Sequence, residues 1–460
     1  MRTQARFIPA AASASIGIIV TVGFSYCVVR AQSAVPTPGT TSSTNSQQKA
    51  ADKDQEKPKN YLERTFTISG QIRERWEGTE GSNFTVTPAD SYVLSRIRLG
   101  LAYKPTSWLR FFGEAMDSRA MFYKISPPSS VDDPMDWHQG YLEVGALEGN
   151  GVKARVGRQE LFIGSNRLVQ SLDWTNIPKT YDVARGTIAT NAFAVDLIGG
   201  SVVLVDPNRM DRSKPGEHFY VAYSSFKKLI PRASIEPYLM AKTQFSVKSK
   251  EGETGAADTL YAGGRMIGTT KGRLDYNFEG VREAGDYAND SIQAWGYLGG
   301  GGWTVSPSLW KLHVSSDYLF ASGNDGKKDG IHDQFDYLYG ANQPFNSLTG
   351  QFAWRNIEDW RAGVDFYPLK KLKVKIDYRD YWLATVQDGL YNAVGIETVL
   401  NAKATSNHVG EGVDTMLTFA INGKTTLGTG VGTLTPGAYL VESKKTSGFL
   451  YPFLYFTRQF

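Results

Sequence analysis

Cysteine is almost absent from this chain of 460 residues, and the absence limits its chemistry. The single cysteine, Cys27, can form neither an intramolecular disulfide nor a thiolate metal cluster. Long hydrophobic runs are also missing after the N-terminal segment, and the mean hydropathy of −0.32 excludes a helical membrane protein. The length allows either several domains or one large closed sheet.

Catalytic and cofactor-binding signatures are missing as well. The five histidines are scattered, and there is no H-E-x-x-H pair, C-x-x-C pair, G-x-S-x-G turn or phosphate-binding glycine loop. We therefore expect no enzyme, no cofactor and no metal site, with a loop-borne enzyme kept as a minor alternative. The acids of residues 322–336 lack EF-hand spacing, which favours a solvated acidic loop over a Ca²⁺ site.

The first 31 residues have the pattern of an export signal. Arg2 and Arg6 precede an uncharged run, and Val29 and Ala31 supply small residues at a cleavage site. An uncleaved inner-membrane anchor is the alternative, because the run is long enough to span a bilayer. Without the three arginines of this segment the net charge of +4 falls to +1, so a nucleic-acid partner is not supported.

Residues 32–62 are rich in Ser, Thr, Pro, Gln and Lys and lack the apolar side chains of a core. This composition predicts a disordered linker, which would lie in the periplasm after export. The expected organisation is a signal peptide at 1–31, the linker at 32–62 and one domain at 63–460.

From residue 66 onward, polar and apolar residues alternate with a period of two. In residues 95–105, for example, Ile97 and Leu99 alternate with Arg96 and Arg98, so a strand would present one apolar and one charged face. The pattern predicts about eighteen strands of roughly ten residues, the length that a tilted strand needs to cross a bilayer. The expected strands are 66–77, 92–104, 108–119, 137–146, 152–162, 181–189, 192–204, 217–227, 232–243, 258–268, 271–282, 290–302, 309–321, 358–368, 371–384, 409–421, 424–434 and 449–460.

The connections between these strands alternate between short and long. Short ones such as 104–107 and 421–424 follow the even-numbered strands, whereas long ones such as 163–180 and 322–357 follow the odd-numbered strands. This alternation is typical of an all-β transmembrane barrel in the cell outer membrane, with short periplasmic turns and long external loops. Closure of the antiparallel sheet is required because lipid cannot satisfy free backbone groups. Since the periplasmic turns are short, any plug would have to come from an external loop such as 322–357 or from the linker.

Strand parity assigns the charged residues to the lumen. Guanidiniums stay charged and bind carboxylates bidentately, and basic rings make pores favour anions. The alternative is that these groups pair with lumenal acids merely to fill the barrel. The expected basic lumen residues are Arg73, Arg75, Arg96, Arg98, Arg110, Arg273, Arg361, Lys373, Lys375 and Arg379; the acids pairing with them are Glu77, Glu114, Asp275, Glu279, Asp365, Asp377 and Asp414.

The densest expected cluster lies on the first three strands. There, five arginines face only Glu77 and Glu114 among their near neighbours. The prediction of an anion path rests on this cluster, whose arginines are Arg73, Arg75, Arg96, Arg98 and Arg110.

Several motifs resemble one known family. "LSRIRLGLAYKPTSWLRFFGEAMDSRA" (94–120), "VGRQELFIGSNRLV" (156–169) and "LDWTNIPKTYDVARG" (172–186) occur in that order. Together they resemble the alginate export domain family of outer-membrane barrels. The resemblance implies a barrel of eighteen strands that carries an anionic polysaccharide. Its uronate carboxylates would meet the arginine cluster and Arg361, and acids such as Glu77, Glu114 and Asp365 would keep those arginines oriented.

The sequence therefore predicts an outer-membrane channel for an anionic polysaccharide or other anionic solutes. A general small-solute porin is the main alternative, and a barrel that anchors a surface enzyme or adhesin is a weaker one. The expected partners are outer-membrane lipids, the anionic solute and possible periplasmic export machinery.

Overall fold

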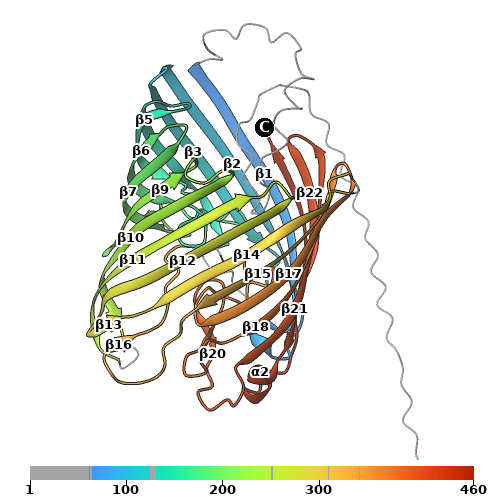
Figure 1. Ribbon diagram of the computed structural model, residues 1–460. Coiled ribbons are helices and arrows are strands. Elements are labelled where there is room, and N and C mark those ends of the chain that lie inside the picture. The colour runs from blue at the N-terminus through green and yellow to red at the C-terminus, as the bar shows by residue number, and fades with distance from the viewer. Residues whose placement is uncertain (1–61, 63–64, 125–130, 250–251, 309, 341) are drawn as a thin grey trace, which may run out of the picture.

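The computed structural model describes residues 62, 65–124, 131–249, 252–308, 310–340 and 342–460. Eighteen long antiparallel strands in these ranges form a closed barrel, in which the last strand pairs with the first (Figure 1). The predicted fold class is thereby confirmed. The predicted signal peptide and all of the linker except residue 62 lie outside the described residues. The barrel strands are β1 (Phe66–Thr79), β2 (Asp90–Thr106), β3 (Leu109–Met121), β4 (Asp133–Gly145), β5 (Gly151–Gln159), β6 (Tyr181–Ala189), β7 (Phe193–Leu204), β9 (Glu217–Phe226), β10 (Ala233–Lys248), β11 (Thr254–Thr269), β12 (Leu274–Tyr287), β14 (Trp295–Ser306), β15 (Leu312–Ala321), β17 (Ile357–Leu369), β18 (Leu372–Trp382), β21 (His408–Asn422), β22 (Thr425–Pro436) and β23 (Phe449–Gln459).

Shorter elements lie in the connections between barrel strands. Among the described residues, no helix is long and apolar enough to cross a membrane. The short elements are η1 (Ser82–Phe84), β8 (Arg212–Ser213), β13 (Asp290–Ile292), β16 (Ile331–His332), β19 (Leu390–Tyr391), β20 (Glu397–Val399) and α2 (Ala438–Glu442).

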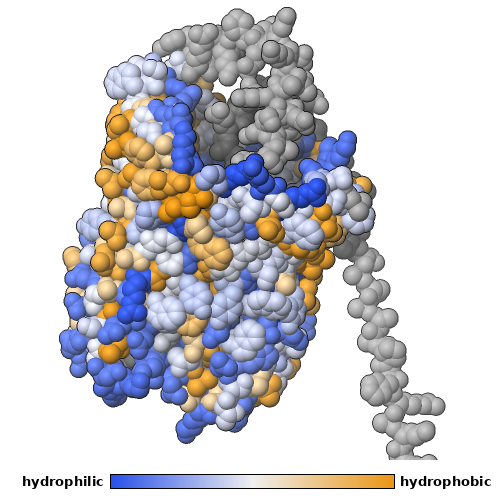
Figure 2. Space-filling view, viewed as in Figure 1, coloured by the Kyte–Doolittle hydropathy of each residue, from blue (hydrophilic) through white to orange (hydrophobic). Residues whose placement is uncertain are grey.

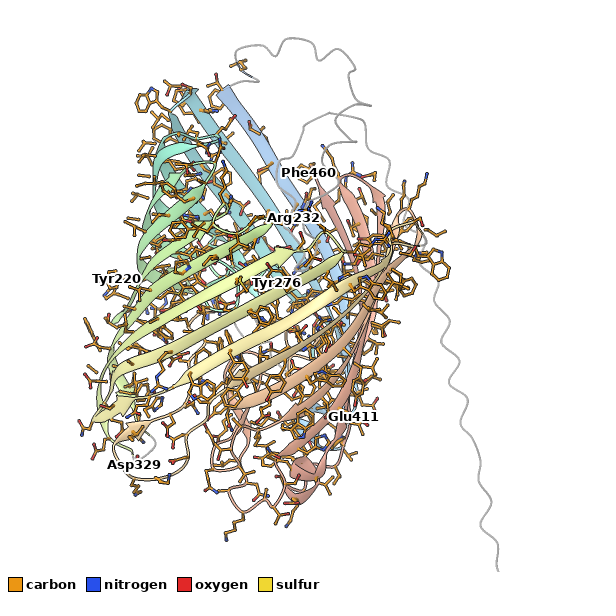
Figure 3. All side chains as sticks on the ribbon, viewed as in Figure 1. Tyr220, Arg232, Tyr276, Asp329, Glu411 and Phe460 are labelled. Carbon is orange, nitrogen blue, oxygen red and sulfur yellow. The ribbon has the colours of Figure 1, made fainter. Side chains whose placement is uncertain are left out.

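The alternating pattern gives the barrel an apolar outer face and a polar inner face. On β2, Leu99 is 57% exposed while its neighbours Arg96 and Arg98 are buried inside. Apolar residues gather on much of the outer surface in Figure 2, and Tyr220 projects from it in Figure 3. Alternation of this kind is what a wall between lipid and a polar lumen requires.

The two ends of the barrel differ in the length of their connections. One end, here called the turn end, has short connections such as 190–192 and 270–273. It also holds the closure of the sheet, where Gly70 and Phe460 exchange backbone hydrogen bonds of 3.1 and 3.0 Å. The other end, the loop end, carries the long connections, including 160–180 and 322–356. The predicted alternation of short and long connections is thus present around the sheet.

Several predicted strands begin later than expected, and in two cases the structure shows the reason. β12 starts at Leu274 because residues 270–273 form a turn, in which the Thr270 hydroxyl accepts hydrogen bonds from the amides of Gly272 and Leu274. β14 starts at Trp295 because residues 290–292 instead form β13, which pairs with β12 and with β16 of a distant loop. Sequence alternation alone could not separate these short pairings from the main strands.

Two long loops fold back into the barrel and pack against each other. The loop of residues 160–180, here called the first inner loop, forms a β-bridge from Val169 to Tyr339 of the loop 322–356, the second inner loop. Buried apolar residues of both loops, such as Leu168 and Trp354, join one core with inward-facing strand residues such as Tyr381. The loop end of the barrel therefore holds a packed interior.

Candidate solute path inside the barrel

Four arginines of β1 and β2 form a cluster on the inner wall, here called the arginine cluster. Arg73 and Arg96 are direct cross-strand partners, and Arg75 and Arg98 extend the row toward either side. All four side chains are buried, and Arg96 is 0% exposed. Because a buried charge is costly unless it is hydrogen-bonded, these arginines need specific partners.

The partners come from the first inner loop. Arg96 forms an ion pair of 2.6 Å with Asp173 and donates a 3.1 Å hydrogen bond to the carbonyl of Thr175. Arg73 donates to the carbonyls of Asp173 and Thr175, the second at 2.8 Å. Arg75 donates to the Trp174 carbonyl, and its guanidinium lies 4.9 Å from the centre of the indole ring. Residues 173–175 therefore cover the arginine cluster.

Carboxylates complete the surroundings of the cluster. Arg98 pairs with Glu160 of the first inner loop at 3.0 Å and lies 3.9 Å from Glu114. Arg75 pairs with Glu77, which also accepts a 2.6 Å hydrogen bond from the Tyr92 hydroxyl. The sequence indicated only Glu77 and Glu114 as near acids. The structure adds Asp173 and Glu160, because the loop that carries them returns into the lumen.

The carboxylate of Asp173 is held in its ionised form. Burial opposes ionisation, but the guanidiniums of Arg96, Arg98 and Arg73 outweigh it and lower the Asp173 pKa to about 2. The side chain is therefore an anion at neutral pH, bound by cations of the barrel wall.

Arg110, the fifth arginine expected in this cluster, belongs to a different group nearer the turn end. It pairs at 2.7 Å with Glu143 of β4, which also pairs with Arg155 of β5 at 2.6 Å. Arg155 lies 4.4 Å from the ring centre of Tyr141. Two arginines thus share one fully buried carboxylate.

A second basic group lies on β17 and β18. Arg361 and Arg379 are cross-strand partners. Arg361 pairs with Asp317 and, at 2.7 Å, with Asp377, whereas Arg379 pairs with Asp359 and lies 3.9 Å from Asp414. These arginines are balanced by wall carboxylates, unlike Arg73, whose oxygens come from the loop. The remaining pairs of this group are Lys373 with Asp365 at 3.6 Å and Lys375 with Asp377 at 2.8 Å.

Three other predicted residues are not joined to these groups. Arg273 is not on the inner wall: it lies exposed in the turn before β12 and donates to the Val305 carbonyl at 3.2 Å. Asp275 is 2.8 Å from His313, and Glu279 accepts a 3.1 Å hydrogen bond from the Tyr238 hydroxyl. The expected lumen position of Arg273 is corrected, because the strand begins one residue after it.

Several inner charges were missed by the sequence interpretation. Strand parity could have found them, because they alternate with outward residues like the predicted ones. For the basic residues of the loops, no such periodic signal exists. The missed pairs are Arg185 with Asp196 at 2.9 Å, Arg265 with Glu236 at 3.0 Å, and Asp336 with Lys242 at 2.8 Å and with Arg355 at 3.1 Å.

The two inner loops and the barrel wall are joined by polar contacts. Arg167 of the first inner loop donates to the Asn346 side chain of the second, and Arg379 of the wall donates to the Phe345 carbonyl at 2.7 Å. The amide of Leu348 donates to Asp414 at 2.9 Å. Part of the expected acidic loop is used here too, since Asp336 is paired with Lys242. The two inner loops are therefore bound to each other, and the second inner loop is also bound to the barrel wall.

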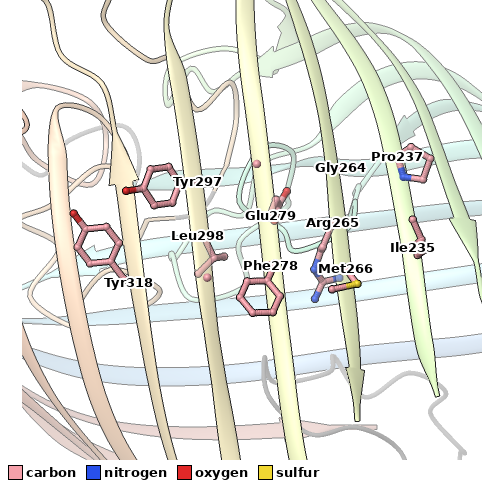
Figure 4. A pocket seen from close by; sticks show the side chains of 12 residues that line it. Ile235, Pro237, Gly264, Arg265, Met266, Phe278, Glu279, Tyr297, Leu298 and Tyr318 are labelled. Atoms are coloured by element: carbon pink, nitrogen blue, oxygen red, sulfur yellow. The ribbon is translucent and has the colours of Figure 1, made fainter. Parts of the chain in front are cut away.

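Two hollows differ in the face that they occupy. A cavity of about 220 Å³ lies beside the first inner loop and is lined by Phe162, Asp196, Glu236 and Arg265 among others. A groove of about 630 Å³ crosses β10 to β15, where outward residues such as Phe278 form its walls (Figure 4). The cavity is bordered by a loop inside the barrel, whereas mostly outward-facing side chains line the groove.

Comparisons with known proteins agree with this architecture. Residues 64–448 match the model of a family described as alginate export. The fold is similar to the Pseudomonas aeruginosa proteins OccK3 (OpdO), with a TM-score of 0.56 and 12% identity over 86% of this chain and 95% of that one, and OccK1 (OpdK), with 0.59 and 12% over 87% and 100%. OpdK solved with vanillate is similar at a TM-score of 0.59 and 11% identity, over 87% of this chain and 100% of that one. No curated protein sequence matches the chain.

Proposed function

Because the chain belongs to the alginate export family, we propose that its barrel passes anionic solutes, among them an acidic polysaccharide, through the bacterial outer membrane. The protein is an outer-membrane barrel, and both the family and the porin-like fold suggest a channel rather than an enzyme. Its turn end faces the periplasm and its loop end faces outward, as in barrels of this kind.

One observation carries the proposal: the arginine cluster is bound by oxygen atoms of a loop. Arg73 donates to two carbonyl oxygens of the first inner loop and lies 3.4 Å from the Asn176 side-chain oxygen. These acceptors are uncharged, whereas a uronate carboxylate would offer Arg73 a charged, bidentate acceptor. An acidic sugar can therefore compete with the loop for the cluster.

Asp173 occupies the position that a substrate carboxylate would take. Its ion pair with Arg96 combines the charge and geometry that an anionic sugar would reproduce. A solute carboxylate that replaced Asp173 would release residues 173–175 from the wall. Binding of an anion would thus displace the first inner loop from the arginine cluster. Competition with the loop would also keep each solute contact brief, as conduction requires.

The proposal is tested by ion selectivity of the purified protein in planar bilayers. Under a KCl gradient, the reversal potential should show preference for chloride. Replacing Arg73 and Arg96 by Gln should shift it toward potassium, whereas the outward-facing R282Q should leave it unchanged. Potassium preference of the wild-type protein would refute the anion path.

A small-solute porin is the second candidate, favoured by the packed interior. The cavity of about 220 Å³ has room for a single small solute. OpdK, whose fold is similar, was solved with vanillate, a small molecule. Oligouronates of increasing length separate the candidates in liposome flux assays. Passage that ends at one or two sugar units would favour the small-solute porin, and passage of long chains would favour polysaccharide transport.

A further inference from the structure

The turn end of the barrel is strongly polarised in charge. Five successive turns, 227–232, 270–273, 307–311, 370–371 and 423–424, together carry nine Lys and Arg residues and no acid. Around the other three turns, Lys104 and Glu148 form an ion pair of 2.8 Å, and their charges cancel. The five turns, here called the basic arc, therefore give one side of the rim a large positive excess.

Three lysines of the basic arc lie exposed on the rim. Lys227, Lys228 and Lys370 are exposed, and within the described part of the chain they form no ion pair with a carboxylate. Arg232 is exposed as well, and Figure 3 shows it at the same end of the barrel as Phe460, away from Asp329 at the loop end. A concentration of like charge without counter-charges creates a positive potential that favours an anionic partner.

Exposed apolar side chains are interleaved with these cations. Leu229 is 66% exposed, Trp310 52% and Leu369 60%, and each adjoins or lies within one residue of a lysine. The Trp310 ring packs at 5.8 Å on Phe366, whose side chain belongs to the outer face of β17. A soluble polyanion has no use for these apolar groups, whereas a lipid surface accepts both kinds of side chain.

The outer face beside the arc marks the depth of the membrane boundary. Leu274 and Trp303 are cross-strand partners on the outer face, and both are nearly half exposed. Leu274 directly follows the turn 270–273. Because aromatic girdles lie at the membrane–water interface, the cations just beyond them lie at headgroup depth. In Figure 2, hydrophilic residues border the mouth of the barrel.

From this combination we propose that the basic arc binds the headgroups of anionic phospholipids in the periplasmic leaflet. The phosphates meet the lysines and arginines, while Leu229, Trp310 and Leu369 enter the acyl region beside them. The opposite side of the rim, with its cancelled charges, makes no such selection. This inference does not depend on which solute the channel passes.

Native mass spectrometry of the detergent-purified protein tests the proposal. The protein is titrated with phosphatidylglycerol and, separately, with phosphatidylcholine of the same acyl chains. The wild-type protein should retain phosphatidylglycerol preferentially. The K227Q/K228Q/K370Q/K371Q variant should lose this preference by about 10-fold or more, given that each basic residue contributes measurably to binding of anionic lipid. The matched control K104Q/E148Q, on the side of the rim where the charges cancel, should keep the preference for phosphatidylglycerol.

Folding of each variant is checked by its heat-modifiable mobility on gels. Equal retention of both lipids by the wild type, or unchanged preference in the quadruple variant, would overturn the proposal. A soluble oligouronate that displaced the bound phosphatidylglycerol, and whose own binding was lost in the quadruple variant, would reassign the arc to polyanion capture.

Discussion

Arg96 illustrates how a fully buried charge is kept inside a membrane barrel. Its guanidinium bonds to Gln71 of the neighbouring strand at 2.6 Å, to the Asp173 carboxylate and to the Thr175 carbonyl. The first acceptor belongs to the wall, whereas the other two belong to the first inner loop. A single residue thereby belongs both to the wall and to the contact that holds the first inner loop.

Removing the charge of Asp173 should loosen that contact. We expect D173N to weaken the closed arrangement by about 2 kcal/mol, because hydrogen bonds to charged groups contribute roughly that much, and so to raise the open fraction about 30-fold. Single-channel recording measures this fraction. The control D117N changes a partly exposed acid that pairs with Arg119 outside the lumen. Equal opening of D173N and wild type would show that the loop is held by backbone contacts alone.

Acid should have the same effect as the mutation. The pKa of Asp173 is lowered to about 2 from its ordinary 3.8, so its contribution to closure is complete above about pH 4 and is lost as the pH falls toward 2. Conductance should therefore be constant from pH 7 to 4 and rise below about pH 3. The D173N variant should lack this acid response; a response of the same size in the variant would assign it to another group.

At the scale of elements, strands were predictable and inner loops were not. The two faces of a barrel strand can be read from its sequence, because successive residues face lipid and lumen in turn. On β2, Leu99 faces outward and Arg98 inward. The first inner loop contains no such period. Its contacts with Arg73 and Arg96 join residues that lie 100 and 77 positions apart in the sequence. Its return into the lumen depends on tertiary partners, which one sequence does not reveal.

Glycine in the motif "GRQEL" offers a test of strand pairing. Gly157 has φ +126°, and an added Cβ would lie 2.3 Å from the Gly140 carbonyl oxygen. We expect G157A to destabilise the pairing of β4 with β5 by roughly 1–3 kcal/mol, seen as a lower midpoint of urea unfolding on heat-modifiability gels. G186A is the matched control, since nothing lies within 4 Å of its added Cβ. Equal midpoints would mean that the backbone relaxes without cost.

The whole molecule is a wide barrel narrowed by its own loops. Eighteen strands leave room for water, and the alternation of connections predicted this enclosure. The sequence also indicated that an external loop or the linker would have to form any plug. It could not show that the two inner loops meet, because they are far apart in the chain. It also could not show that Asp173 joins the arginine cluster, which lies on strands distant in the sequence.

Locking the inner loops together should block a long solute. The bridge partners Val169 and Tyr339 can be replaced in a V169C/Y339C variant, in which the native Cys27 lies far away in the sequence. If opening requires separation of the loops, oxidation should lower oligouronate flux at least 10-fold, and a reductant should restore it. The single variants V169C and Y339C control for lost packing. Unchanged flux through a verified cross-link would show that solutes pass beside the joined loops.

The closing seam between β1 and β23 makes closure of the sheet depend on two strands that lie far apart in the sequence. Seven residue pairs, from Gln71 with Gln459 to Glu77 with Phe453, join the two strands. A truncated product that lacked β23 would leave β1 and β22 as bare edges, which invite foreign strands and proteases. The loss of either seam strand would therefore expose two sheet edges at once, so the integrity of the barrel wall depends on both strands.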